Sequence, residues 1–333
     1  MRANLFVFAL SASIAFGQDQ SRVFHLHHIE SEQDLKEFAT MVRLVAELPQ
    51  VKADSAQKTL AVQGPASQIA IAEFLFTELD RQTVPDSVSQ EFRPSRGSDD
   101  VVRLLFVPHA KTVADFQQIT TSVRLVTEMQ RVFTLNRSRA LAVRGTADQV
   151  AGAEFLVQEL DQPDDAKRTD SSIHQMIDPR KMGFTAVQVF YLPYTSTIKQ
   201  FQEVATLTRN IGEIRQVFTY NSPRALIVRG TPDQVALADW MVHELAKPVA
   251  AEASQKYQYP DIYRDHENIV RVFYVKDAAT VAAFQQLATE IRTATKIRRV
   301  FTYNESMALA VRGTEAQIAM AEQMLHDRQI AAK

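Results

Sequence analysis

The segment Val228-Arg229-Gly230-Thr231-Pro232-Asp233-Gln234 specifies the architecture of this chain, because its first half is written again elsewhere. It returns as Val143-Arg144-Gly145-Thr146 and as Val311-Arg312-Gly313-Thr314, with a diverged copy at Val62-Gln63-Gly64-Pro65. The four glycines are spaced 81, 85 and 83 residues apart. This is much longer than the roughly 20 to 50 residues of a solenoid repeat. The spacing therefore predicts four tandem small domains.

The threonine and glutamine of this line have the spacing of a capping box, in which two side chains satisfy free amides at a helix start. A glycine precedes each threonine, and we expect it to let the chain turn sharply from a strand into the helix. A lone glycine is a weak phosphate-binding signal, so we interpret these residues as structural. The predicted caps are Gly145, Thr146 and Gln149; Gly230, Thr231 and Gln234; and Gly313, Thr314 and Gln317.

The last copy shows the pattern of secondary structure best. Residues 270–275 are β-branched and aromatic, which predicts a strand. Apolar residues at spacings of three and four predict a helix over 280–295. Residues 299–303 and 308–312 form a predicted hairpin, and 315–326 a second helix. The predicted class is α+β, with four βαββα modules, each a three-stranded sheet with two helices on one face.

The module boundaries follow from the repeat. We place a signal peptide at 1–17 and modules at 21–80, 100–161, 185–246 and 268–328. The linkers between them contain prolines and mixed charges and are longer than loops inside compact domains usually are. They are Arg81 to Ser98, Gln162 to Gly183, and Lys247 to Glu267.

The N-terminal residues have the features of a secretory signal. Met1 to Asn4 carries one positive charge, and Leu5 to Phe16 is apolar but shorter than the roughly 20 residues that cross a bilayer. Small Ala15 and Gly17 precede the expected cleavage site. We therefore expect a mature chain that begins at Gln18 and is periplasmic; the alternative is a buried N-terminal helix.

The composition of the chain argues against several classes of function. The chain has no cysteine, so an exported form needs no disulfides. With 37 basic and 39 acidic residues it has no general attraction to nucleic acid or anionic lipid. We expect no membrane span in the mature chain.

The sheets are expected to bury one face under the helices and leave the other open. In the first strands we assign Val102, Leu104 and Phe106, with their counterparts, to the core, and the alternate residues to the open face. Large apolar residues beside arginine are typical of protein interfaces. Packing of this face on the linkers or on the adjacent copy is an equal alternative. The candidate partner-binding residues are Arg103, Leu105, Arg144, Phe190, Arg229, Phe273 and Arg312.

The first copy differs at its first strand, where His25 and His27 are expected on the open face. Two imidazoles so placed are weak candidates for half of a zinc site, but no cysteine or well-spaced acidic residue completes it. We predict no metal and no cofactor. A polar capping module is the favoured interpretation, because end repeats often present a polar outer face.

The repeated module resembles the short N-terminal domains of bacterial secretins, also called NolW-like domains. The resemblance lies in the βαββα order, in the segment Asn221 to Gln234, and in helix ends such as Glu159-Leu160-Asp161-Gln162-Pro163. It implies a ring-building periplasmic module without catalytic residues, which packs against identical modules and binds envelope components. Secretins continue into a large β-barrel domain, whereas this sequence ends at Lys333. We therefore do not expect the chain to form the channel itself.

Three functional hypotheses follow. The first is a non-enzymatic envelope scaffold or adaptor that binds secretion or pilus components or its own copies, as a possible homo-oligomer. The second is KH-like nucleic-acid binding, which the absence of a Gly-x-x-Gly loop opposes. The third is an enzyme, which the absence of Gly-x-Ser-x-Gly, His-Glu-x-x-His and cysteine opposes.

Overall fold

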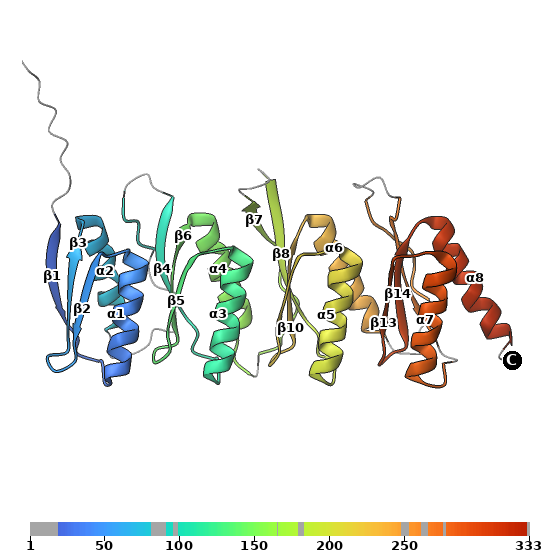
Figure 1. The fold of residues 1–333 in the computed structure, drawn as a ribbon, viewed down its shortest axis with the longest axis horizontal. Coiled ribbons are helices and arrows are strands. Elements are labelled where there is room, and N and C mark those ends of the chain that lie inside the picture. Colours follow the sequence, from blue (N-terminus) through green and yellow to red (C-terminus); the bar gives the residue numbers. More distant parts are fainter. Residues whose placement is uncertain are drawn as a thin grey trace, which may run out of the picture.

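The computed structural model describes residues 19–80, 91–95, 99–164, 166–178, 183–247, 253–260, 266–275 and 278–331. They form four small antiparallel sheets, each accompanied by two helices, which confirms the mixed α+β class. The four units follow one another in a single row (Figure 1). The predicted signal peptide at 1–17 lies outside the described residues. In the described part of the chain, no helix is both long and apolar enough to cross a bilayer.

We call each set of three strands and two helices a module. Module 1 contains β1 (Gln20–His25), α1 (Glu32–Ala46), β2 (Gln50–Asp54), β3 (Thr59–Gly64) and α2 (Ala66–Leu79). Module 2 contains β4 (Asp100–Phe106), α3 (Val113–Thr127), β5 (Arg131–Leu135), β6 (Ala140–Thr146) and α4 (Ala147–Leu160). Module 3 contains β8 (Gly183–Tyr191), α5 (Ile198–Gly212), β9 (Gln216–Tyr220), β10 (Ala225–Gly230) and α6 (Pro232–Leu245). Module 4 contains β12 (Ile269–Tyr274), α7 (Val281–Thr295), β13 (Arg299–Tyr303), β14 (Ala308–Gly313) and α8 (Glu315–Ala331).

Two linkers supply strands that the sequence did not predict. They are β7 (His174–Asp178), which pairs with β8, and β11 (Tyr257–Gln258), which pairs with β12. The sheets of modules 3 and 4 therefore have four strands rather than three, in the orders β7-β8-β10-β9 and β11-β12-β14-β13. In module 2 the linker makes a single bridge, from Phe92 to Val102.

The strand that carries the Val-Arg-Gly line lies in the middle of each module's three strands. It pairs antiparallel with both neighbours, so each residue of the line has a partner on either side. Val102 and Arg131, for example, both lie opposite Arg144. Residues directly opposite one another share a face of a sheet. The register therefore places the arginine of the Val-Arg-Gly line and the first-strand valine on the same face.

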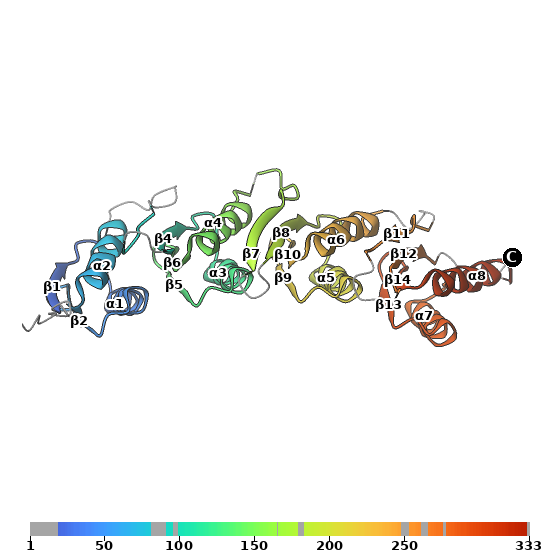
Figure 2. The same cartoon turned by 90° about the horizontal axis from the view of Figure 1, so that it is seen from above.

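That face is covered by the helices of the preceding module. We call it the stacking face and define it by nine positions, three from each strand. In module 2 these are Val102, Leu104, Phe106, Arg131, Phe133, Leu135, Ala140, Ala142 and Arg144. The apolar ones belong to one buried cluster with Leu35, Phe38 and Met41 of α1. The same arrangement joins modules 2 and 3 and modules 3 and 4, and the helix pairs of modules 1 to 3 each lie between their own sheet and the next one (Figure 2).

The predicted assignment of the sheet faces was wrong. Val102, Leu104 and Phe106 pack on the preceding module, whereas Leu105 and Val107 are buried against Phe116 of their own module. Alternation fixes which residues share a face but not which face is the core, and these strands are apolar on both faces because both are covered. Of the two alternatives for the second face, the structure has the one in which it packs on the adjacent copy.

The helix starts show why threonine, glutamine and glycine recur together. Thr146 and Gln149 form a capping box in which each side chain accepts a hydrogen bond from the other's backbone N–H. Thr231 and Gln234 make the same pair of bonds. A Cβ on Gly230 would lie 2.7 Å from the Gln234 Oε1 atom. Glycine therefore leaves room for the capping glutamine beside it, which is a reason for its recurrence in addition to the sharp turn that we expected.

Candidate functional site

The joint between modules repeats the same hydrogen bonds three times. The arginine of each Val-Arg-Gly line donates to a carbonyl in the last turn of the preceding module's first helix: Arg144 to Val45, Arg229 to Val126 and Arg312 to Ile211. Arg229 and Arg312 are only 4% and 2% exposed. The last carbonyls of a helix have no partner within the helix and carry the negative end of its dipole. The arginine of the next module donates a hydrogen bond to such a carbonyl and places a positive charge at the negative end of the dipole.

Two further contacts frame each joint. The residue that ends the first helix is Glu47, Glu128 or Glu213, all in left-handed conformation. Its carboxylate accepts a bond from the next module's second strand, with Arg131 and Glu47 2.6 Å apart in the first joint. At the other end of the joint, the Asn221 N–H donates to Gln118 at 3.2 Å. Asn136 and Asn304 make the corresponding bonds to Glu37 and Glu203.

The second helix of modules 1, 2 and 3 is held by the linker that follows it. An aromatic residue of the linker packs against an aromatic residue of that helix: Phe92 stacks on Phe74 and His174 on Phe155, and Tyr257 lies tilted against Trp240. The ring centroids are 5.0, 4.7 and 5.1 Å apart. Each of these linker residues also lies opposite the first valine of the next module's stacking face. We call this arrangement the aromatic clasp.

Tyrosines extend the contact to the end of the second helix. The Tyr191 hydroxyl donates to the Glu159 carbonyl and the Tyr274 hydroxyl to the Glu244 carbonyl, each at 2.5 Å. Burial raises the pKa of both tyrosines well above the usual value of 10. Burial also raises the pKa of Tyr220, another stacking-face residue, to about 12. All three hydroxyls therefore stay protonated at physiological pH, and those of Tyr191 and Tyr274 serve as donors.

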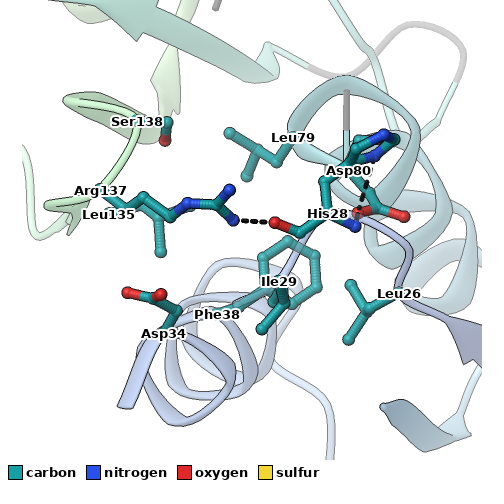
Figure 3. Close-up of a pocket in the computed structure, with 10 residues that line it drawn as sticks. All are labelled: Leu26, His28, Ile29, Asp34, Phe38, Leu79, Asp80, Leu135, Arg137 and Ser138. Atoms are coloured by element: carbon teal, nitrogen blue, oxygen red, sulfur yellow. Dashed lines mark hydrogen bonds and ion pairs between the residues drawn. The ribbon is translucent and has the colours of Figure 1, made fainter. Parts of the chain in front are cut away.

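One joint contains a small cavity of about 100 Å³, between modules 1 and 2. Arg137 reaches across it to the carbonyl of His28, and the Ser138 hydroxyl is buried without a hydrogen-bond partner (Figure 3). Ligand pockets usually have volumes of about 300 to 1,000 Å³. A cavity of this size suits a few water molecules rather than an organic substrate.

Two larger grooves follow the outer edge of the hairpins, with volumes of about 350 and 410 Å³. Each lies between a first helix and the second strand of the next module. The strand edge is partly capped, because Arg124 donates to the Val132 carbonyl and Arg209 to the Val217 carbonyl, both at 2.6 Å. Blocking of this kind keeps a sheet edge from pairing with other chains.

The structure separates the seven candidate partner-binding residues into two groups. Arg144, Arg229 and Arg312 lie in the joints as described above. Leu105, Phe190 and Phe273 lie in the cores of their own modules, and Arg103 pairs with Glu154 of α4 at 2.7 Å. Binding of another protein by any of them stays a prediction.

The two candidate histidines of module 1, His25 and His27, are exposed. His25 ends β1, and His27 follows the strand with its Nδ1 atom 3.3 Å from the Asp80 carboxylate. In the described residues, the group of three side chains close enough to hold a metal is elsewhere, at Asp170, Asp239 and His243. Their ligand atoms lie within 4.8 Å of one another, and His243 lies 3.3 Å from Asp170. These contacts also form an ordinary ion-pair cluster.

Comparison with known proteins finds secretin N-terminal regions among solved structures. ExeD of Aeromonas hydrophila is 15% identical, with a TM-score of 0.18, over 69% of this chain and 41% of its own. The N-terminal domain of the secretin XcpQ from Pseudomonas aeruginosa is 14% identical, with a TM-score of 0.22, over 63% of this chain and 74% of its own. The chain thus spans less than half of ExeD. No protein-family model and no curated protein matches the chain.

Proposed function

We propose that this protein is an exported, non-enzymatic scaffold of the cell envelope that binds protein components of a secretion or pilus system. The observation that carries the proposal is the joint between modules. It occurs three times, each time with an arginine, a helix end and an aromatic clasp at equivalent positions. Such a joint fixes the order and spacing of the modules. A row of modules held in this way can present binding surfaces at set distances.

The sequence supports the same proposal. The resemblance of the repeated module to secretin N-terminal domains implies a role in protein binding, and the sequence has no familiar catalytic motif. Because the stacking faces of modules 2 to 4 are buried, the surfaces left for partners are the sides of the row and its two ends. Of the two alternatives that we weighed for the second sheet face, partner binding and packing on the chain itself, these three modules have the second.

Site-specific photocrosslinking in the producing cell tests the proposal. A photoreactive residue is placed at the exposed positions Leu44, Leu125 and His25, and at the buried position Leu104 as the control. We expect discrete adducts with envelope proteins at one or more exposed positions and none at Leu104. Absence of adducts at all exposed positions across the row, or recovery of the protein only from the cytoplasm, would contradict the proposal.

A further inference from the structure

The outer edge of the first strand is paired in modules 2, 3 and 4. Phe92 and Val102 exchange backbone hydrogen bonds of 2.9 and 2.8 Å, and β7 and β11 pair with β8 and β12. Ser171 and Ser254 add to this pairing, because each donates its N–H to the strand and accepts the strand's N–H on its hydroxyl. A preceding segment of the chain therefore pairs with this edge in every later module, as a strand in modules 3 and 4 and through one bridge in module 2.

In the part of the chain that the structure describes, module 1 has the same edge without such a segment. By its register β1 places Ser21 where module 2 has Val102, since Ser21 lies opposite Gln63 and Val102 opposite Arg144. Backbone groups of alternate residues point to opposite sides of a strand. The N–H and C=O groups of Ser21 and Val23, and the N–H of His25, consequently point outward. Within the described residues no backbone or side-chain group bonds to them.

This edge also lacks the devices that usually protect a free strand. Such edges are blunted by proline, by bulges or by charged side chains that cover the backbone. In modules 2 to 4 the hairpin edge on the other side of the sheet has an arginine that donates to a backbone carbonyl. On β1 the one arginine, Arg22, is engaged with Glu73 at 2.7 Å, and Val23 is 52% exposed. The edge is thus open and bordered by an exposed apolar side chain.

We propose that the outer edge of β1 binds an extended segment of a partner polypeptide, which adds antiparallel as a fourth strand to the sheet of module 1. Strand addition obtains its affinity from main-chain hydrogen bonds and its specificity from alternate side chains. The later modules indicate the pattern of the segment, Ser-x-x-aromatic, as in Ser171-Ser172-Ile173-His174 and Ser254-Gln255-Lys256-Tyr257. This inference identifies one binding surface of the proposed scaffold. It rests on the proposed function only in expecting the partner among envelope proteins.

A synthetic peptide with the sequence of residues 168–178 tests the proposal on the purified protein. We expect saturable binding, and slower amide hydrogen exchange at Ser21, Val23 and His25, by at least about tenfold at saturation. The amides of Arg22 and Phe24 point to β3 and are already protected, so they should change little. An alternating pattern of this kind is specific to strand addition, because binding on the sheet face would not distinguish neighbouring amides.

Matched variants separate edge pairing from side-chain contact. Ser21→Pro removes an outward N–H that makes no bond to β3, and we expect at least about tenfold weaker binding, since proline is tolerated on edge strands but cannot donate. Ser21→Ala keeps the N–H and should bind like the native protein. Should Ser21→Pro fail to fold, a peptide with proline in place of Ser171 makes the same test from the other side.

Three results would overturn the proposal. They are equal binding by Ser21→Pro and Ser21→Ala, absence of the alternating protection, and a concentration-dependent dimer that shows this protection without peptide. The last result would mean that a second copy of the chain occupies the edge. Failure of peptide binding would leave photocrosslinks at other positions unaffected, so it is distinguishable from failure of the proposed scaffold function.

Discussion

A single arginine in each joint links two modules at the level of individual atoms. Arg229 donates from Nη1 to the Val126 carbonyl of module 2 and from Nε to the Thr185 hydroxyl of its own module, the latter at 3.0 Å. A guanidinium at a helix C-terminus is favourable for both hydrogen bonding and the helix dipole. Module 1, the first module of the described row, has Gln63 at the same position. The arginine therefore occurs where there is a helix end to bind.

We expect Arg229→Gln to destabilise the joint between modules 2 and 3 by about 2 kcal/mol, because hydrogen bonds to charged groups contribute roughly 1.5 to 3 kcal/mol each. The measurement is hydrogen exchange of β8 and α3 amides under native conditions. The reciprocal control, Gln63→Arg, places a guanidinium on an exposed face and should change stability by less than about 0.5 kcal/mol. Equal effects of the two substitutions would contradict this role of the arginine.

The helix cap of module 1 is incomplete. Pro65 stands at the N-cap of α2 without a side-chain hydrogen bond, and the Gln68 Oε1 atom is buried without a partner. Proline has no N–H to offer that oxygen. Pro65→Thr restores the pair found in modules 2 to 4, and we expect it to stabilise module 1 by about 1 kcal/mol. Thermal unfolding checks this, with Thr231→Ala as the opposite change, expected to cost about 1 kcal/mol in module 3.

His174 makes one aromatic clasp sensitive to pH. Burial lowers the pKa of His174 below its usual 6.5, and Asp148 opposes this shift. The unfolded chain therefore takes up a proton more readily than the folded one, so stability is lost as the pH falls through about 6.5. His174→Phe keeps a ring at this position, as Phe92 does in module 2, and should remove this component. Comparing the melting temperatures of both proteins between pH 8 and 5 tests it; parallel curves would contradict the assignment.

At the scale of elements, the linkers act as strands and clasps rather than as spacers. We expect Trp240→Ala to weaken the attachment of β11 by about 1 to 3 kcal/mol, since it removes a large half-buried ring from Tyr257. Faster hydrogen exchange at Val270 and Val272 is the readout. Gln323 occupies the matching position of α8 and is exposed. Gln323→Ala therefore serves as the control, with an expected change below about 0.5 kcal/mol.

The sequence predicted the helices, the hairpins and the middle strand well, because these depend on local periodicity and capping. It did not predict β7 and β11, because His174 and Tyr257 form strands only through pairing with the next module. It also placed Leu105 and Phe190 on the wrong face, since a strand covered on both sides has no polar face to mark solvent. The arginine of the Val-Arg-Gly line was the sequence signal for the correct face. Arg144 lies opposite Val102, so the arginine and the valine share the stacking face.

At the scale of the whole molecule, the two ends of the row differ from its joints. The stacking face of module 1 has Ser21, Lys52, Asp54 and Gln63 at positions that are mainly apolar or arginine in later modules. The predicted polar capping character of this module agrees with these residues. The other end differs as well: Lys296 ends α7 where the earlier first helices end in glutamate, and Glu290, Ala294 and Gln323 are exposed. Charged and small residues thus replace the contacts of a joint at both ends.

We therefore expect that copies of the native protein do not stack head to tail. Substitutions that introduce the residues of a joint at both ends should make them stack. A tail graft, Glu290→Leu with Ala294→Ile, Lys296→Glu and Gln323→Trp, restores the residues that module 3 presents to module 4. A head graft, Ser21→Val with Lys52→Phe and Gln63→Arg, restores the opposing face. A chain carrying both grafts should form filaments whose length grows with concentration, because a heterologous contact that does not close propagates.

Light scattering and electron microscopy distinguish the outcomes of this experiment. Each graft alone should leave the protein without filaments, since the other half of the joint is missing, and a mixture of the two single grafts should form head-to-tail pairs. Those pairs are the sharpest test, because they need the arginine, the helix-ending glutamate and the clasp ring on different chains. Filaments of the ungrafted protein at the same concentrations would show that the polar ends do not stop the row, and would contradict the interpretation of both terminal modules as caps.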